Sequence, residues 1–231
     1  MKMLMPLRAA VLVCCAGFGL WLGAAILQLP APSVRLTEQV QTHLNASGVT
    51  HAVTAVLLNF RGYDTLLEIA VLLLALLGVL AASREEHPAG QFLSKSPQPV
   101  LQAMARLLTP LMVLVAGYLL WAGAHRPGGA FQAGAVLASS GVLLYLANFI
   151  PVWAAPDRLL RAGLVAGFLL FLGVAALLLT QGSLLQYPPR FAGALILLIE
   201  TGLTLSLGLI LLGLFLWLPD ENEEAEKCNP S

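Results

Sequence analysis

The sequence predicts an all-α integral membrane protein with about six transmembrane helices, and three observations support that fold class. Of the 231 residues, 58% are hydrophobic and only 10% are charged, whereas a soluble domain normally carries roughly 25% charged residues. The mean hydropathy is +0.85, and a compact soluble domain of this size could not bury so much apolar surface. The apolar residues also form continuous runs long enough to cross a bilayer, which takes roughly 20 residues in helical form.

These runs predict helices rather than the strands of a membrane barrel, because barrel strands alternate between apolar and polar residues. Within lipid the backbone N–H and C=O groups must be paired inside the segment, which a helix achieves. The expected spans cover residues 8–29, 63–82, 103–124, 129–150, 159–179 and 191–218.

The first span also resembles a cleaved signal peptide, because Lys2 and Arg8 precede its apolar stretch. That stretch is about twice the usual core of 7–15 residues, and no clean small-x-small cleavage site follows it. We therefore expect a retained helix with Cys14 and Cys15 inside it. Three cysteines in the whole chain exclude a disulfide-rich secreted scaffold.

Two connections between spans are long. Residues 30–62 contain a possible short amphipathic helix over 34–44 and a second apolar stretch over 53–60. The proline-containing connection after the second span looks like a linker. The expected organisation is a two-helix unit at 1–90, a linker at 91–102, a four-helix domain at 103–218 and an acidic tail at 219–231.

The basic residues predict the orientation. With six spans both termini lie on one side of the membrane, and that side carries most of the 12 Lys and Arg residues. They are Lys2, Arg8, Arg84, Lys95, Arg106, Arg158, Arg161 and Lys227. Because cytoplasmic loops carry an excess of Lys and Arg, we expect cytoplasmic termini, an external loop at 30–62, and a cytoplasmic linker and tail.

Ionisable side chains inside the spans mark candidate functional sites, because a charge at the bilayer centre costs at least about 2.5 kcal/mol. At the start of the second span, Asp64 and Glu68 are four residues apart and share a helix face. Arg61 joins that stripe if the helix includes it. Two close carboxylates resist double ionisation, so one can hold a proton, while Arg61 opposes this. The set is suited to proton transfer.

A structural alternative stays open for the same residues. Thr65 and Glu68 have the spacing of a capping box, in which Thr65 caps the helix and the Glu68 side chain answers its amide. Asp64 would then interact favourably with the positive end of the helix.

Glu200 lies about ten residues into the sixth span, roughly 15 Å along the helix axis. Thr204 follows one turn later on the same face and could hydrogen-bond the carboxyl group. We favour a role for Glu200 in an ion or proton path. The alternative is a protonated carboxyl group that holds two helices together.

Small residues at steps of three or four predict close helix packing in the fourth and fifth spans. A helix that starts at Gly129, after the tight Pro127-Gly128 turn, would leave its first amides free for capping or for an anion. The packing candidates are Gly128, Gly129, Gly134, Gly141, Gly163 and Gly167.

Signatures of other classes are missing from the sequence. We find no Gly-rich phosphate loop, no catalytic Ser/His/Asp set and no metal-ligand spacing at His43, His51 or His87, so we expect no enzyme activity, metal or cofactor. The 12 basic residues balance 12 acidic ones without a basic stripe, which argues against nucleic-acid binding. No inverted repeat of a self-sufficient transporter is visible. We therefore expect one component of a larger complex.

Two stretches resemble known families. Residues 51–68, His-Ala-Val-Thr-Ala-Val-Leu-Leu-Asn-Phe-Arg-Gly-Tyr-Asp-Thr-Leu-Leu-Glu, resemble a segment shared by the E-type protein of membrane-bound hydrogenases (MbhE) and the C-terminal region of the A-type protein of Mrp antiporters (MrpA). Residues 127–134, Pro-Gly-Gly-Ala-Phe-Gln-Ala-Gly, resemble the Pro-Gly-Gly-Gly-Phe motif of the B-type antiporter protein (MrpB or MnhB), with Ala130 in place of the usual Gly. Glu200, in an Ile-Glu-x-Gly context, matches the acidic residue of the last B-type helix.

The resemblance implies an E-type unit and a B-type unit fused in one chain. It implies a multi-pass subunit of a Na⁺/H⁺ antiporter in the bacterial or archaeal cell (inner) membrane, in contact with lipid and with other subunits of the complex. By resemblance, Asp64, Glu68 and Glu200 would exchange a proton for Na⁺ or pass one on. Two alternatives remain: the same module in a redox complex such as a membrane-bound hydrogenase, and a structural assembly protein without a transport role.

Overall fold

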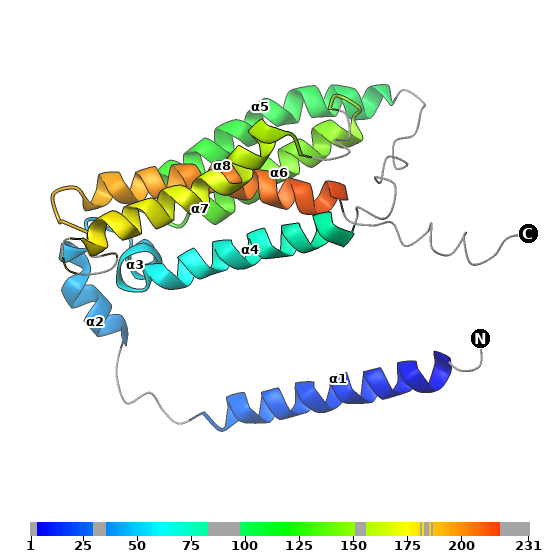
Figure 1. Ribbon diagram of the computed structural model, residues 1–231, viewed down its shortest axis with the longest axis horizontal. Coiled ribbons are helices and arrows are strands. Elements are labelled where there is room, and N and C mark those ends of the chain that lie inside the picture. Colours follow the sequence, from blue (N-terminus) through cyan, green and yellow to red (C-terminus); the bar gives the residue numbers. More distant parts are fainter. Residues whose placement is uncertain are drawn as a thin grey trace, which may run out of the picture. The chain divides into compact units, whose positions relative to one another are not determined.

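The computed structural model describes residues 4–29, 36–82, 98–150, 156–180, 182, 185 and 187–217. Every regular element in these ranges is a helix, which confirms the all-α prediction. The helices are α1 (Leu4–Leu27), α2 (Leu36–His43), α3 (Ala52–Ala55), α4 (Gly62–Ala82), α5 (Pro99–Ala122), α6 (Ala130–Leu146), α7 (Arg158–Leu179) and α8 (Ala192–Trp217) (Figure 1).

The chain forms two compact units, residues 1–39 and 40–231. The first unit contains α1, whose side chains from Val11 to Leu27 are almost all exposed. A helix that is apolar on every side and covered by nothing in its own unit is suited to lipid. Cys14 and Cys15 are exposed free thiols on this helix.

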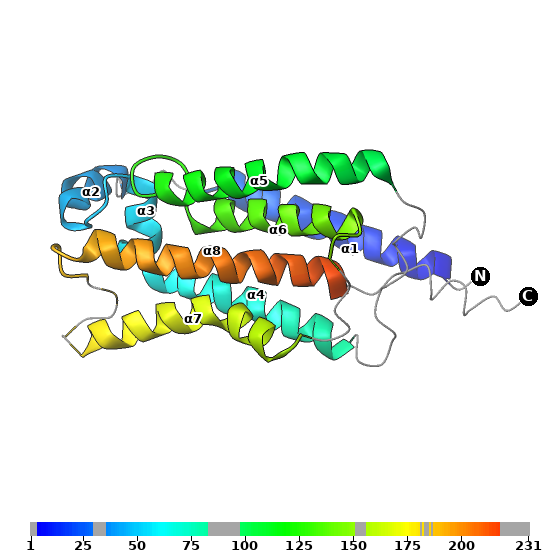
Figure 2. The same ribbon diagram turned by 90° about the horizontal axis from the view of Figure 1, so that it is seen from above.

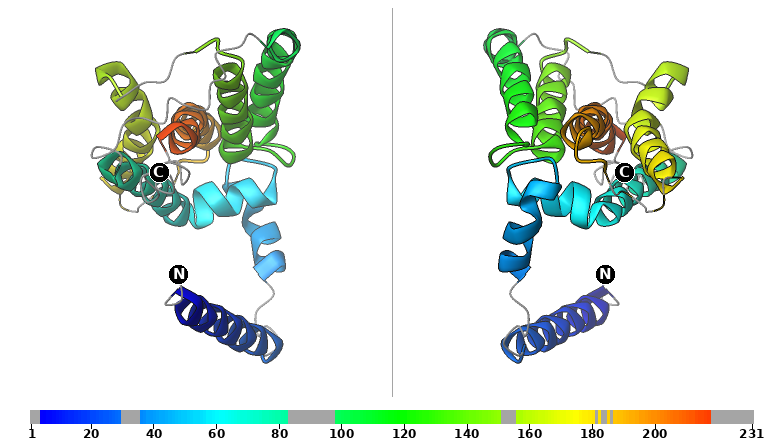
Figure 3. Two further views of the ribbon diagram at one scale, coloured as in Figure 1. Left: turned by 90° about the vertical axis from the view of Figure 1, so that its right-hand side faces the viewer. Right: turned by 90° about the vertical axis from the view of Figure 1, so that its left-hand side faces the viewer.

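Helix α8 forms the centre of the second unit. Helices α6 and α7 pack along it, α5 packs on α6, and α4 contacts both α7 and α8 (Figures 2 and 3). Because α8 is apolar around its whole circumference, it must be surrounded by protein or lipid. Its fully buried side chains include Ile196, Ile199, Leu203, Leu207 and Ile210.

Small residues bring α6 and α7 close to this central helix. A Cβ atom at Gly134 of α6 would lie 2.9 Å from the Cβ atom of Leu207, and one at Gly167 of α7 would lie 2.6 Å from the carbonyl oxygen of Gly202. The corresponding pairs one or two turns away are Gly141 with Leu212 and Gly163 with Leu209. The small residues of α6 and α7 therefore face α8 from its two sides.

Four helices, α4, α5, α7 and α8, are long and apolar enough to cross a membrane, and α6 and the Val11–Leu27 part of α1 are shorter apolar helices. Helix α6 ends at Leu146, four residues before the predicted end of the fourth span. The chain leaves the helical conformation there, because Asn148 has a positive φ of 60°, a conformation that ends a helix.

The start of helix α5 also differs from the prediction. Helix α5 begins at Pro99, inside the predicted linker at 91–102, because proline is favoured in the first turn of a helix. Residues 91–97 of that linker and the predicted acidic tail at 219–231 lie outside the described residues. The chain between α2 and α4 is mostly helical, with a 3₁₀ turn at Leu44–Ala46, the short helix α3 and a π-helical turn at Val56–Phe60.

Candidate functional site

Glu200 lies inside the helix bundle of the second unit. Its side chain is 4% exposed. Glu200 lies eight residues after the start of α8, which is about 12 Å along the helix axis. The flanking residues Ile199 and Leu203 are fully buried. A carboxyl group in such apolar surroundings needs a hydrogen-bond partner for each of its oxygens.

The first turn of helix α6 supplies one of these partners. The backbone N–H of Ala130 donates a hydrogen bond to the Glu200 side chain. Ala130 is the first residue of α6, where the backbone amides have no partner within the helix and the helix dipole is positive. The position of α6 against α8 therefore places a carboxyl group at a helix start that would favour its ionised form.

The glycine before α6 makes this contact possible. Gly129 has a φ of +118°, a region that residues with a Cβ atom rarely adopt. A Cβ atom at this position would also lie 2.9 Å from Oε1 of Glu200. Gly129 therefore combines a backbone turn and a close approach that only glycine allows.

The end of helix α5 closes the other side of this turn. The N–H of Gly129 donates to the carbonyl oxygen of Leu119, at 2.9 Å. A Cβ atom at Gly123 would lie 2.8 Å from Cα of Gly129 and 3.3 Å from Oε1 of Glu200. The turn between α5 and α6 thus wraps tightly around one oxygen of the carboxyl group.

The second oxygen, Oε2, is buried and has no hydrogen-bond partner in the described part of the chain. An unpaired buried polar atom costs free energy, so the partner of Oε2 is expected from outside the described chain, as a water, a hydrogen-bond donor or a cation. With Oε1 held and Oε2 open, the carboxyl group can bind a proton, a hydrogen-bond donor or a hard cation at one defined atom.

Thr204 lies one turn after Glu200 and is buried as well, at 3% exposure. The sequence suggested that it could hydrogen-bond the carboxyl group. In the structure its hydroxyl group instead donates to the backbone carbonyl oxygen of Glu200, at 2.7 Å. Such a bond between residues i and i−4 is common for threonine in helices, so Thr204 fixes the backbone beside the site.

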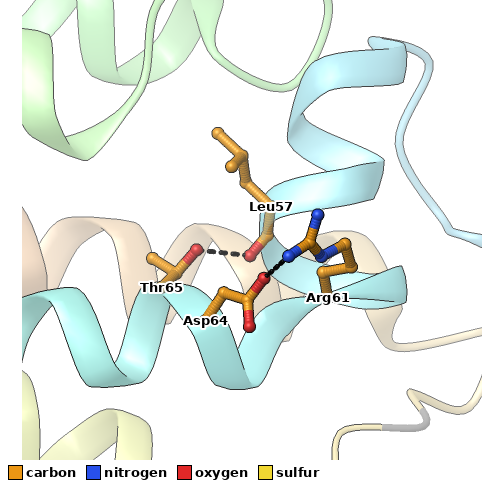
Figure 4. A network of polar contacts seen from close by, with 4 residues as sticks. All are labelled: Leu57, Arg61, Asp64 and Thr65. Atoms are coloured by element: carbon orange, nitrogen blue, oxygen red, sulfur yellow. Dashed lines mark hydrogen bonds and ion pairs between the residues drawn. The ribbon is translucent and has the colours of Figure 1, made fainter. Parts of the chain in front are cut away.

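The second group of candidate residues surrounds the start of α4. Arg61 and Asp64 form an ion pair (Figure 4), and their side chains are 65% and 29% exposed. The hydroxyl group of Thr65 donates to the carbonyl oxygen of Leu57 at 2.6 Å, in the π-helical turn that precedes α4. Arg61 therefore pairs with one carboxylate, and Thr65 ties α4 to the segment before it.

The capping-box alternative does not describe this helix start. Helix α4 begins at Gly62, three residues before Thr65, so Thr65 already lies within the helix. Its hydroxyl group binds Leu57, outside α4. Asp64, in the first turn of α4, has the position in which a carboxylate interacts favourably with the helix dipole.

Glu68 is exposed on the outer surface of α4, whereas Glu200 is buried in α8. In the described residues, no hydrogen bond or ion pair joins Asp64 or Glu68 to Glu200. No group of three His, Cys, Asp or Glu residues there could hold a metal ion. The candidate residues thus form two separate groups, one around Glu200 and one around Asp64.

Polar contacts from residues 50–54 were missed by the sequence analysis. The hydroxyl group of Thr54 donates to the carbonyl oxygen of Gly123, at 2.5 Å. The backbone amides of Thr50 and His51 both donate to the carbonyl oxygen of Ala124, at 3.2 Å. A polar threonine within the apolar stretch at 53–60 was the signal that could have indicated Thr54.

Residues 100–217 match the family described as the domain related to the MnhB subunit of Na⁺/H⁺ antiporters. The chain belongs to this family. The MnhB-related domain contains nearly all of α5 to α8, with the turn at Gly129 and with Glu200, whereas Thr54, Asp64 and Glu68 precede it. Its family and its apolar helices make the chain a multi-pass protein of the prokaryotic cell membrane.

A curated relative is the A/B component of a probable K⁺/H⁺ antiporter from Rhizobium meliloti (strain 1021), which is 27% identical over 167 residues. The alignment covers 62% of this chain but 17% of the relative, so the chain spans less than a fifth of that protein. Because 62% of the chain is more than the MnhB-related domain contains, the alignment also includes residues outside 100–217.

Two solved structures are similar to most of the chain. A chain of the membrane-bound sulfane sulfur reductase, an archaeal respiratory membrane complex, is 25% identical with a TM-score of 0.69, and the match covers 90% of this chain and 96% of that one. A chain of the Mrp complex from Dietzia sp. DQ12-45-1b is 24% identical with a TM-score of 0.68, over 93% of this chain and 26% of that one. The second similarity concerns the fold alone.

Proposed function

We propose that this chain is a membrane subunit of an Mrp-type cation/proton antiporter and that it contributes Glu200 to the path of the proton and the cation. Membership of the MnhB-related family supports this assignment, as do the antiporter relative and the fold shared with an Mrp complex. The relatives are transport components, and the chain acts in transport rather than as an enzyme.

The observation that carries the proposal is the state of the two Glu200 oxygens. Helix α6 binds the carboxylate through the Ala130 amide, and Oε2 stays unpartnered although the side chain is only 4% exposed. The Ala130 contact already joins α8 to α6 through one oxygen, so the second oxygen is the atom left for transport. One fixed and one open oxygen suit a group that takes up a proton, releases it and accepts a cation such as Na⁺ in its place.

The residues around α4 form the second part of the proposed path. Asp64 is paired with Arg61, and Glu68 lies further along the same helix on its exposed face. An ionisable side chain on the outer face of a membrane helix needs a polar partner or a water-filled cavity. We therefore assign Asp64 and Glu68 to a contact with other subunits of the complex, and Glu200 to the inner step.

The proposal includes a two-part chain, with an E-type unit at residues 1–90 ahead of the B-type domain. The antiporter relative carries the designation A/B, and its alignment extends outside 100–217. The match to the sulfane sulfur reductase covers 90% of this chain. Both observations support a unit before the MnhB-related domain that shares ancestry with these complexes.

The test is a Glu200→Gln substitution in the assembled complex, with Thr201→Val as the control. Thr201 is the next residue of α8 and is exposed, and its hydroxyl group binds Leu197 within the same helix. In membrane vesicles, Glu200→Gln should reduce Na⁺- or K⁺-dependent proton exchange on the order of tenfold or more, because glutamine cannot release a proton. Unchanged exchange by an assembled Glu200→Gln complex would favour the structural role.

A respiratory complex is the second candidate context. The similar chain of the sulfane sulfur reductase complex is covered over 96% of its length, so a protein of this size occurs there as one chain. Purification of the tagged protein in mild detergent decides between the contexts. Large antiporter-like subunits without iron–sulfur proteins support the antiporter, whereas cluster-binding subunits indicate redox-coupled ion transport.

A further inference from the structure

We propose that Thr54 is a positioning residue for Glu200, and that residues 50–54, which precede the MnhB-related domain, hold the turn between α5 and α6 that binds the carboxyl group. This inference rests on the proposed function. Thr54 does not contact the carboxyl group. It acts through the turn between α5 and α6, which holds Oε1.

Residues 50–54 bind the end of helix α5. The last carbonyl groups of any helix have no partner within the helix, and here two successive carbonyl groups beyond α5 receive donors from this segment. Thr54, which is 5% exposed, donates to the carbonyl oxygen of Gly123 at 2.5 Å. The carbonyl oxygen of Ala124 accepts the amides of Thr50 and His51 and the Thr50 hydroxyl group at 3.2 Å.

The chain of contacts continues from Gly123 to Glu200. Gly123 is buried, and its α-carbon lies so close to Gly129 that an added Cβ atom would be 2.9 Å from the Gly129 nitrogen. Gly129 precedes Ala130, the residue whose amide binds the carboxylate. A displacement of Gly123 therefore moves the backbone that seats Oε1.

Residues 50–54 lie between two parts of the chain that are themselves held by hydrogen bonds. Ser47, which precedes this segment, is fully buried. Its carbonyl oxygen accepts a hydrogen bond from the side-chain amide of Asn59, which follows the segment, at 3.1 Å. After the segment, Thr65 of α4 binds the carbonyl oxygen of Leu57. Figure 2 shows α3 beside the connection between α5 and α6. The position of the Thr54 hydroxyl group is thus fixed by residues on either side of it.

Residues outside the MnhB-related domain thus help to build the site around Glu200. The domain supplies Glu200, Ala130 and the glycine turn, while the preceding segment supplies the donors that hold the turn in place. This division accounts for the threonine within the apolar stretch at 53–60. A valine there would fit the hydrophobic pattern but would leave the Gly123 carbonyl group unpaired.

The experiment measures the access of a reagent to Glu200 in the purified complex. Dicyclohexylcarbodiimide, a hydrophobic reagent for protonated carboxyl groups, is added, and the labelled Glu200 peptide is followed over time by mass spectrometry. Thr54→Val removes the donor at nearly constant volume. It should accelerate labelling roughly tenfold, the factor that corresponds to the loss of one buried hydrogen bond, and should weaken the apparent affinity for the transported cation.

Two further variants make the result specific to the hydroxyl group. Thr54→Ser retains the donor and should label and transport like the native chain, and Thr201→Val controls for loss of a hydroxyl group elsewhere in the bundle. If Thr54→Val does not assemble, Thr54→Cys, which keeps a weak donor, replaces it and should label at an intermediate rate. If Glu200 is labelled at the native rate in Thr54→Val, or in Thr54→Cys in its place, the positioning role is overturned.

The outcomes separate this inference from the proposed function. If Glu200→Gln abolishes exchange and Thr54→Val labels at the native rate, the positioning role fails and the transport role of Glu200 stands. If Glu200→Gln leaves exchange unchanged, the proposed transport role fails. In that case accelerated labelling of Thr54→Val still supports positioning of the carboxyl group by Thr54.

Discussion

Two membrane helices of this protein carry carboxyl groups, and the burial of these groups differs between the two helices. On α4, Asp64 pairs with a mostly exposed arginine and Glu68 lies on the outer surface. On α8, Glu200 is 4% exposed and is held by a backbone amide at the start of α6. Asp64 and Glu68 therefore face the surroundings of the bundle, whereas Glu200 is enclosed by the chain itself.

This difference has a physical origin in the packing of the two helices. Helix α8 is surrounded because glycines of α6 and α7 approach it from two sides, so a side chain on α8 is buried by neighbouring helices. Helix α4 contacts α7 and α8 with only part of its surface. A carboxyl group on its outer face depends on lipid headgroups, water or another protein of the complex for its partner.

The largest expected effect comes from a charge reversal. Glu200→Lys should prevent assembly or lower stability by about 3–5 kcal/mol, because it buries an unpaired cation at the positive end of α6. Glu68→Lys, the matched change on α4, should leave the fold of this chain intact because the side chain is exposed on it, and its cost should be confined to the proposed contact with other subunits. The yield and unfolding midpoint of the purified variants provide the measurement.

The same pair of variants can also break the comparison. If Glu68→Lys lowers the unfolding midpoint of the isolated chain as much as Glu200→Lys does, Glu68 is enclosed by the chain itself. If Glu200→Lys assembles with a native unfolding midpoint, the enclosed site around Glu200 does not exist as described.

An intermediate effect is expected at the glycine turn. Gly129→Ala combines backbone strain at a φ of +118°, about 1–3 kcal/mol, with a Cβ atom 2.9 Å from Oε1 of Glu200. Gly182→Ala is a matched control, since Gly182 has a φ of +122° and no atom within 4 Å of its added Cβ atom. Cation-dependent proton exchange should fall in Gly129→Ala only, although both variants should lower the unfolding midpoint. Equal exchange in the two variants would leave strain as the whole effect.

The smallest effect is expected at the exposed ion pair. In the isolated chain, Arg61→Gln should change stability by less than about 1 kcal/mol, because solvent screens a pair whose arginine is 65% exposed. The small change in unfolding midpoint should disappear in high salt. A larger effect in the isolated chain that persists in high salt would contradict the solvent exposure of the Arg61–Asp64 pair.

Several features followed from the sequence because they depend on local patterns. Continuous apolar runs predicted helices at every described span, and small residues at helical spacing predicted the faces on which Gly134 and Gly167 lie. The turn before Ala130 was expected to leave amides free for an anion. Each of these depends on residues close together in the chain.

Other features needed the tertiary structure. The spacing of Thr65 and Glu68 permitted a capping box that starts at Thr65. In the structure the π-helical turn ends at Phe60 and α4 begins at Gly62, three residues before Thr65. Thr204 shares a face with Glu200, but its hydroxyl group binds the nearer backbone carbonyl oxygen. The bond from Thr54 to Gly123 joins residues 69 positions apart, beyond the reach of any local pattern.

The sequence by itself determined that this protein lies in a membrane, which segments are helical, and that Glu200 is a carboxyl group too costly to place in lipid without a reason. Tertiary packing decided which carboxylate is enclosed, which of its oxygens is bound and which segment holds the turn beside it. The reason is one of range. Hydrophobicity and helical periodicity are written into neighbouring residues, whereas burial and hydrogen bonding depend on atoms that only the folded chain brings together.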